Sequence, residues 1–230
     1  MNQKKILHIG IIPDGNRRWA REKNLAIWKG HSRALESSKL KSLIDISKKY
    51  NIKYLTFWGF STENWKRSFE EKEYLFKLFE KAIEDFSIFF NKEDIKFRHI
   101  GRKDRFPKKL LYKIQNLEKQ TKNNKSFNFS VCLDYGGRDE IIRAVNKIIN
   151  SGIKKVNEEV FKSFLDTREL PYLDIIIRTS GEKRLSGFFP FQGAYAELFF
   201  VKKYFPDFSE KDFEKIIKDF NKRDRRFGGD

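Results

Sequence analysis

The chain is nearly free of cysteine, since Cys132 is the only one among its 230 residues. One thiol forms no disulfide within the chain, so the sequence indicates a reducing compartment and we expect a cytoplasmic protein. Cys132 lies in the apolar run FNFSVCL, which favours a small buried side chain over a reactive one. The sequence therefore excludes a disulfide-stapled secreted domain.

Long apolar runs are also missing. No stretch of about eighteen apolar residues occurs, and the best candidate, 188–201, contains Gln192 and Glu197. The short apolar run after Lys4 and Lys5 has no small-residue cleavage site, so it does not predict a signal peptide. We expect a protein that contacts a membrane at most peripherally.

Internal repeats and breaks in composition are absent, which predicts one domain over residues 1–230. What the chain does have is positive charge, with 49 Lys and Arg against 32 Asp and Glu. An excess of this size favours an anionic partner: nucleic acid, a membrane surface or a phosphorylated substrate. The lysines are scattered evenly over the chain, so we do not expect nucleic acid as the partner.

Apolar runs alternate with segments of helical periodicity. Strands are predicted over 6–12, 52–60, 95–100, 127–133, 173–177 and 197–201. Helices are predicted over 31–50, 68–90, 107–122 and 158–165, after Gly136-Gly137, and from Ser209, where Asp212 completes a capping box. Because the strands are almost continuously apolar, we predict an α/β fold with a mostly parallel six-stranded sheet flanked by helices.

The stretch from 8 to 31 carries the first chemical signal. Its strand stops at Pro13 and delivers Asp14 and the residues 15–19 into a helix. The amides of such a turn and two arginines suit phosphate oxygens. A carboxylate there repels a phosphate unless a divalent cation lies between them, which points to Mg²⁺. The alternative is that Asp14 only caps the helix and the arginines are solvated.

Three polar blocks follow predicted strands: Asp14, the segment 61–67, and Arg178. Because ligands bind beyond the carboxyl ends of parallel strands, we expect these blocks to meet at one edge of the sheet.

Five blocks in order carry a family resemblance: HIGIIPDGNRRWAREKNLAIWKGH (8–31), FSTENWKR (60–67), IRTSGEKRLSGF (177–188), AYAELFF (194–200) and RDRRFGG (223–229). They resemble the signature of the cis-prenyltransferases, the family of undecaprenyl and dehydrodolichyl diphosphate synthases. The resemblance implies Mg²⁺-dependent, sequential condensation of isopentenyl diphosphate onto an allylic diphosphate primer. Each addition leaves a cis double bond, and the product is a lipid carrier precursor. It also implies a hydrophobic tunnel, a homodimer and transient contact with a membrane surface.

The resemblance assigns catalytic roles to Asp14, His31 and Asn64. Asp14 and Glu197 match the metal carboxylates, and we expect them to face a shared cleft. His31 matches a residue beside the primer diphosphate that donates a hydrogen bond or shuttles a proton. Asn64 matches the residue proposed to help remove the proton. Since an amide is a poor base, we expect it to orient a proton path that diphosphate oxygens complete.

The implied substrate contacts are Gly15, Asn16, Arg17, Arg18, Trp19, His31, Ser61, Thr62, Glu63, Trp65, Arg67, Arg178, Arg184, Leu185, Ser186, Arg226 and Gly228. Some have plain structural alternatives: Trp65 as core, Arg67 as a surface ion pair, and RDRRFGG as a frayed tail. Glu71 matches a family glutamate, but a capping box with Ser68 explains it equally well. Glu182 is expected to orient the arginines.

The chain departs from the family pattern at a few positions. Ile27 stands where an arginine is common, and Arg17 is the candidate to replace that contact. Ser180 and Gly187 replace a common glycine and a common asparagine. Paired DDxxD motifs, typical of the all-helical trans-type synthases, are absent.

Other interpretations remain open. One is a non-catalytic subunit of a heteromeric synthase, and another is a basic nucleic-acid-binding protein. Phe79, Phe86 and Phe90, on the long helix, are candidates for the tunnel wall or for ordinary core.

Overall fold

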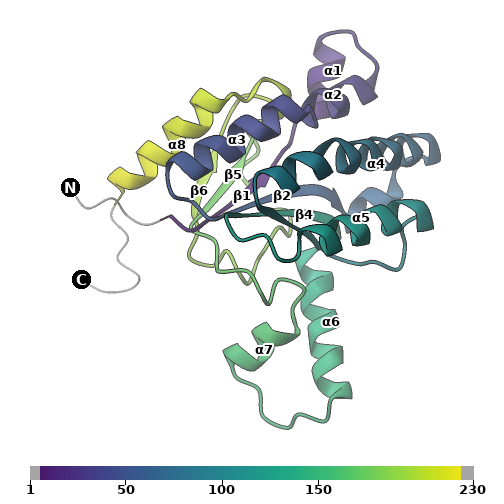
Figure 1. The fold of residues 1–230 in the computed structure, drawn as a ribbon, viewed down its shortest axis with the longest axis vertical. Coiled ribbons are helices and arrows are strands. Elements are labelled where there is room, and N and C mark those ends of the chain that lie inside the picture. The colour runs from purple at the N-terminus through teal and green to yellow at the C-terminus, as the bar shows by residue number, and fades with distance from the viewer. Residues whose placement is uncertain (1–5, 224–230) are drawn as a thin grey trace.

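Six parallel strands form the centre of the structure, in the order β3-β4-β2-β1-β5-β6 (Figure 1). The computed structural model describes residues 6–223. The strands are β1 (His8–Ile12), β2 (Tyr54–Ser61), β3 (Ile95–Ile100), β4 (Phe127–Tyr135), β5 (Ile175–Arg178) and β6 (Glu197–Phe200). The predicted α/β fold is confirmed, and all the strand pairs are parallel. β1 lies inside the sheet, with β2, β4 and β3 on one side of it and β5 and β6 on the other.

Eight α-helices occur in the described part of the chain. They are α1 (Asn16–Glu22), α2 (Ile27–Ala34), α3 (Ser37–Lys49), α4 (Phe69–Lys92), α5 (Lys108–Thr121), α6 (Gly137–Asn150), α7 (Glu158–Phe164) and α8 (Glu210–Lys222). Two short 3₁₀ helices, η1 (Thr62–Lys66) and η2 (Phe205–Asp207), complete the set. The capping box predicted for Ser209 and Asp212 is present at the start of α8.

The single helix predicted over 31–50 is wrong. The chain leaves the helical conformation at Glu36 (φ −56°, ψ 127°) and forms α2 and α3 instead. No proline or glycine marks this break in the sequence. Both helices contact α4, but their main helical partners differ, since α2 packs beside α1 and α3 packs beside α8, so the chain changes direction between them.

The larger part of the core lies on the face of the sheet that α3, α4, α5 and α8 cover. A smaller cluster lies on the opposite face, where the rings of Phe188 and Phe189 stack with their centroids 4.5 Å apart. Cys132 belongs to this second cluster and is fully buried, as the apolar run around it predicts. α6 and α7 extend away from the sheet as an arm (Figure 1).

His8 is a fully buried histidine in β1. Its Nδ1 lies 2.8 Å from the carbonyl oxygen of Pro171 and its Nε2 lies 2.8 Å from Oγ1 of Thr56. Since the carbonyl only accepts, Nδ1 carries the proton of the neutral ring. Burial lowers the pKa of His8 to about 4, against partial opposition from Pro171 and Asp174.

The buried His8 makes stability depend on pH. The unfolded chain binds a proton near pH 6.5 that the folded chain excludes until about pH 4. We therefore expect the free energy of unfolding to fall as the pH drops from 6.5 to 4, by on the order of 3 kcal/mol for His8 alone. Urea unfolding at a series of pH values measures this, and a flat profile over that window contradicts it.

Candidate functional site

A polar pocket of about 290 Å³ lies at the carboxyl edge of β1, β2 and β5. The predicted site residues that line it are Asp14, Asn16, His31, Ser61, Glu63, Asn64, Arg67, Arg178 and Ser186. The prediction that three blocks far apart in the sequence meet at one edge of the sheet is confirmed. They meet because β2, β1 and β5 are neighbours and run in the same direction.

Asp14 and Arg178 form the centre of this pocket. Nη2 of Arg178 lies 2.8 Å from Oδ2 of Asp14, and its Nη1 donates to Oγ of Ser186 at 2.7 Å and to the carbonyl oxygen of Arg184 at 2.5 Å. Burial raises the pKa of Asp14, but the hydrogen bond and charge of Arg178 outweigh this and lower it overall. One guanidinium thus fixes an ionised carboxylate and the loop 184–186 together.

The turn after β1 requires glycine. Gly15 has a φ of 97°, and a Cβ atom there would lie 2.4 Å from Cδ1 of Tyr204. The amide of Gly15 donates to Oδ1 of Asp14 at 2.7 Å, so Asp14 bonds its own turn and does not cap α1 by a bond into the helix. The helix-cap alternative for Asp14 is therefore not supported.

Arg18 and Arg184 lie at the rim, where Glu182 connects them. Nη1 of Arg18 donates to Glu182 at 2.9 Å, and Nη1 of Arg184 donates to the same carboxylate at 2.5 Å. Nη2 of Arg18 also donates to Oγ of Ser180 at 2.6 Å. Ser180 holds a φ of 78°, a conformation that favours glycine and is strained for serine. The contact with Arg18 gives this serine a role in the site.

Glu71 lies at the centre of a second cluster. Its Oε1 is 3.2 Å from Nη1 of Arg67, 3.6 Å from Nε2 of His31 and 3.9 Å from Nε of Arg17. Ser68 accepts from the amide of Glu71 at 3.2 Å, which is only half of the expected capping box. The carboxylate of Glu71 faces the site and does not bond back to the helix.

His31 is neutral at pH 7 in this cluster. Burial lowers its pKa to about 4, and the charge of Arg67 adds to this effect, while Glu71 opposes it. Nε2 of His31 and Nε of Arg17 are buried and have no hydrogen-bond partner among the described residues. Oε1 of Glu71 lies 3.6 and 3.9 Å from them and forms its ion pair with Arg67. Oδ1 of Asn16 is also buried without a partner in the described part of the chain. Buried polar atoms normally have partners, so the unpartnered atoms are prepared for a ligand or for water.

The block FSTENWKR contains the last two residues of β2 and the short helix η1. Ser61 and Asn64 make a reciprocal capping box, in which Oδ1 of Asn64 accepts from the amide of Ser61 at 3.0 Å. The acceptor atom of Asn64 is thus engaged by the backbone. Trp65 points away from the pocket, donates to Asp134 at 2.8 Å and packs on Phe60, as its core interpretation predicts.

Other predicted contacts lie outside the pocket. Trp19 donates to Asp207 at 2.9 Å, Thr62 donates to Glu63 at 3.1 Å, and Leu185 packs against the second core cluster. Arg226 and Gly228, from RDRRFGG, lie outside the described residues.

The expectation that Asp14 and Glu197 share a cleft within one chain is wrong. Glu197 begins β6 and pairs in register with Ile175, which pairs with Ile9 in β1. Asp14 lies five residues beyond Ile9, which is about 16 Å farther along parallel strands. Glu197 instead accepts from Arg223 at 2.5 Å. A residue that starts a strand lies at the opposite edge from one that ends a strand.

Asp14 and Glu63 are the carboxylates that line the polar pocket, and of these Asp14 is the predicted metal ligand. No group of three or more His, Cys, Asp or Glu suited to a metal occurs between residues 6 and 223. This donor set fits Mg²⁺, which is commonly bound by one or two carboxylates, water and the phosphates of a substrate. It does not fit a metal held by protein ligands only.

An apolar cavity of about 90 Å³ adjoins the polar pocket. Pro13, Asn16, His31 and Gly59 line both hollows. Phe79, Phe86 and Phe90 line the cavity from α4, and β-strand residues line it from the sheet. A charged pocket thus lies directly beside an apolar cavity, with four residues as their common wall.

Sequence reasoning missed Tyr204, which packs against Gly15 and lies 5.6 Å from the guanidinium of Arg18. No local pattern marks Tyr204, because its partners lie about 190 residues earlier in the chain. It also missed Pro13 and Gly59 as shared walls of the two hollows. The strand ends at which they lie were a usable signal.

Comparison with known proteins identifies the family of the chain. Residues 12–228 match the family model "Putative undecaprenyl diphosphate synthase". The chain is 44% identical to the isoprenyl transferase of Thermotoga maritima, covering 96% of both chains. It is 40% identical to a tritrans,polycis-undecaprenyl-diphosphate synthase (geranylgeranyl-diphosphate specific) of Pyrococcus furiosus, over 96% of this chain and 86% of that one.

Among solved structures, lavandulyl diphosphate synthase from Lavandula x intermedia, in complex with dimethylallyl diphosphate, superposes with a TM-score of 0.92. Its identity to this chain is 32%, and the match covers 97% of this chain and 98% of that one. The five sequence blocks, the parallel sheet and these matches lead to one conclusion. The chain belongs to the undecaprenyl diphosphate synthase family and is a cis-prenyltransferase.

Proposed function

We propose that the protein is a Mg²⁺-dependent cis-polyprenyl diphosphate synthase that adds isopentenyl diphosphate units sequentially to an allylic diphosphate primer. The observation that carries the proposal is the junction of the polar pocket and the apolar cavity at Pro13, Asn16, His31 and Gly59. A prenyl diphosphate has this same division into a charged head and an apolar tail. The proposed product is the precursor of a lipid carrier.

The head of the primer is proposed to bind beside Asp14, Asn16 and Arg18. Breaking its C–O bond leaves a diphosphate, and charge developing on that group is stabilised by fixed donors. Bound Mg²⁺ would supply further positive charge to the leaving group through Asp14. Arg67 and Arg17 lie beside His31, around the carboxylate of Glu71, and Nε of Arg17 is buried without a hydrogen-bond partner among the described residues. Arg17 is proposed to make the contact with the primer diphosphate for which Ile27 has no charge.

The isopentenyl diphosphate is proposed to bind at Arg178, Arg184 and Ser186. Its terminal alkene carbon forms the new bond to the primer, positive charge develops on the adjacent branched carbon, and the CH2 group on the other side of that carbon loses a proton to form the new double bond. His31 is neutral at pH 7, so it serves as a hydrogen-bonding group there and not as a strong acid. Asn64 orients the path, and diphosphate oxygens accept the proton.

The test is incubation of the protein with labelled isopentenyl diphosphate and allylic primers of increasing length. Among relatives, the Pyrococcus furiosus synthase is named for geranylgeranyl diphosphate, and the lavender enzyme was solved with dimethylallyl diphosphate. We expect lipid products only with primer and only with Mg²⁺. Equal incorporation in the presence of EDTA overturns the metal dependence, and no product with any primer overturns the proposal.

We propose that the apolar cavity is the inner part of a product tunnel. Its volume of about 90 Å³ is smaller than the ~150 Å³ that holds benzene. A growing chain must therefore displace aromatic side chains of the wall. Each five-carbon unit buried contributes roughly 4 kcal/mol at about 0.8 kcal/mol per methylene, so the long product leaves slowly into water.

Phe86→Leu should lengthen the products. Phe86 is buried in the cavity wall and stacks on Phe90 at 5.2 Å, so a smaller side chain leaves more room for hydrocarbon. Thin-layer sizing of the lipids measures the shift. Phe213→Leu, in the same core but away from the cavity, is the matched control. An unchanged distribution in Phe86→Leu removes this residue from the tunnel.

We propose a homodimer in which the α6 arms of two copies pair. Ile142, Val145 and Ile149 lie on one side of α6 and are 61%, 41% and 67% exposed. An apolar stripe on a projecting helix favours burial against a partner (Figure 1). We expect Ile142→Asp to weaken self-association at least about tenfold, measured by sedimentation. Asn150→Asp is the control, and an unchanged association constant contradicts the interface.

Contact with a membrane surface is proposed at the end of the molecule where α1, α2 and α4 meet. No helix of the described part is long and apolar enough to cross a bilayer. Trp28 and Phe69 are largely exposed there, and Trp28 packs beside Tyr74 of α4. The protein is proposed to act in the cytoplasm and to deliver its product at the membrane surface.

A further inference from the structure

A second polar hollow lies at the β3 edge of the sheet. It has a volume of about 840 Å³ and shares no lining residue with the polar pocket. Its walls come from β3, the loop 101–104, the end of α5, α6 and the segment 166–169, and we call it the β3-edge groove. Seven cationic side chains and four carboxylates line it, so the groove carries an excess of positive charge.

The carboxylates of the groove are already used. They pair as Arg98 with Glu169, Arg102 with Asp104, Arg143 with Asp166 and Lys103 with Glu118, at 2.6 to 2.9 Å. Lys96, Lys122 and Arg168 have no carboxylate within ion-pair distance among residues 6–223. The groove is therefore short of negative charge.

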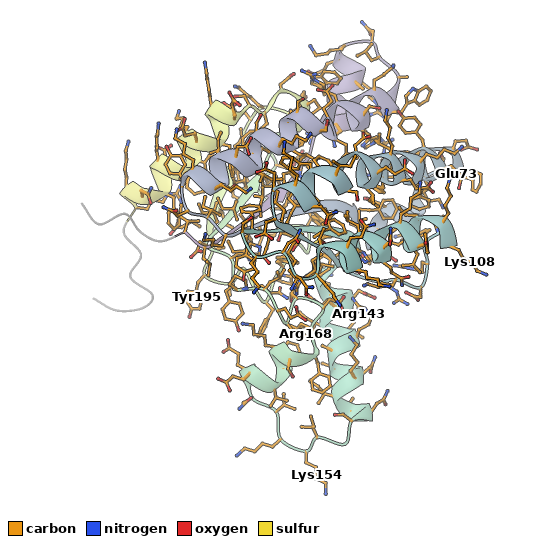
Figure 2. All side chains as sticks on the ribbon, in the orientation of Figure 1. Glu73, Lys108, Arg143, Lys154, Arg168 and Tyr195 are labelled. Carbon is orange, nitrogen blue, oxygen red and sulfur yellow. The ribbon has the colours of Figure 1, made fainter. Side chains whose placement is uncertain are left out.

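Two of these unpaired cations, Lys96 and Arg168, line the groove together with the ion pair of Arg98 and Glu169. Lys96 and Arg98 alternate with Phe97 along β3 and so share one face of the strand. Arg98 lies 2.6 Å from the Glu169 carboxylate. The charges of Arg98, Arg168 and Lys96 lower the pKa of Glu169. Figure 2 shows Arg143 and Arg168 where α6 meets the sheet. An anion with two charges would balance this cluster.

We propose that the β3-edge groove is a second anion site, which binds the phosphate or diphosphate group of a soluble ligand between Lys96, Arg98 and Arg168. Guanidinium groups bind phosphate oxygens in pairs, and an ammonium adds a point charge. Charges on an edge strand also prevent strands of other molecules from pairing with it. Preventing strand pairing needs charges on β3 only. A hollow, and a cation such as Arg168 contributed by a distant segment, are instead what a ligand site needs.

The experiment is hydrogen–deuterium exchange of the full chain with and without inorganic pyrophosphate, at constant ionic strength. We expect protection of the segments 101–104 and 166–169 in addition to the polar pocket. The double variant Lys96→Ser, Arg168→Ser should weaken binding in the groove by about a hundredfold and abolish its protection. The control double variant Lys108→Ser, Lys154→Ser removes the same amount of charge from exposed positions elsewhere, and it should retain the protection of the groove.

The outcomes separate this site from the synthase site. The groove variant should keep its synthase activity, because none of its changed residues lines the polar pocket. Protection at the polar pocket alone, or equal loss in both double variants, overturns the proposal. Vesicles that contain phosphatidic acid form a second arm. Protection of the groove by vesicles but not by pyrophosphate assigns the charge to a lipid surface and overturns the soluble ligand.

Discussion

Asp14→Asn should lower the rate of condensation by about a thousandfold. Asparagine has the same shape and keeps one of the two acceptor oxygens, so it retains the bond to the amide of Gly15 and loses the one to Arg178; we expect the turn after β1 to remain folded. The variant also loses the negative charge that a Mg²⁺ ion bridging to the diphosphate requires. Incorporation of labelled isopentenyl diphosphate over a range of Mg²⁺ concentrations measures the loss.

The control for this variant is Asp45→Asn, an equal change of charge on the exposed side of α3. Thermal unfolding of both variants separates a chemical effect from a structural one. If Asp14→Asn retains more than a tenth of the activity, the carboxylate is not the metal ligand. If it unfolds well below the control, its ion pair with Arg178 is chiefly structural.

Arg178→Lys should lower kcat by about a hundredfold and raise the KM for isopentenyl diphosphate. Arg178 donates to Asp14 with Nη2 and Nε, and its Nη1 donates to Ser186 and to the carbonyl oxygen of Arg184. A lysine ammonium is a single point and spans only one of these contacts. Ser186, which holds a φ of 53°, then loses the bond that fixes its loop.

Steady-state kinetics with isopentenyl diphosphate and primer varied in turn measures this change. The KM for the primer should change less, because the primer is assigned to the Asp14 side of the pocket. Arg33→Lys, in an exposed ion pair with Glu36, is the matched control. An equal rise of both KM values contradicts the assignment of Arg178 to isopentenyl diphosphate.

The helix broken at Glu36 and the position of Glu71 show where sequence patterns fail. The periodicity from 31 to 50 is continuous, and only the different packing partners of α2 and α3 separate them. The motif of Ser68 and Glu71 is a valid capping signal, and half of it forms. The carboxylate of Glu71 nevertheless faces Arg67, since a nearby buried cation attracts it more strongly than a backbone amide does.

Glu197 shows a different failure. Its sequence motif predicts that Glu197 lies in the site and shares a cleft with Asp14, where the two carboxylates would hold one metal ion. The structure does not provide that cleft within one chain, and the assignment to the family depends instead on the polar pocket and the similarity to known enzymes. The position of Glu197 at the start of a strand was the sign that it lies at the other edge.

The sequence by itself determined the alternation of strands and helices, the turn after Pro13 and the capping box at Ser209. These features depend on contacts within a few residues, and the pattern of side chains contains them in full. Only the tertiary structure decided that β2, β1 and β5 are neighbours, which residues face the pocket, and that Glu197 lies far from Asp14. Strand order and register arise from packing between segments that are distant in the sequence, and no local pattern specifies them.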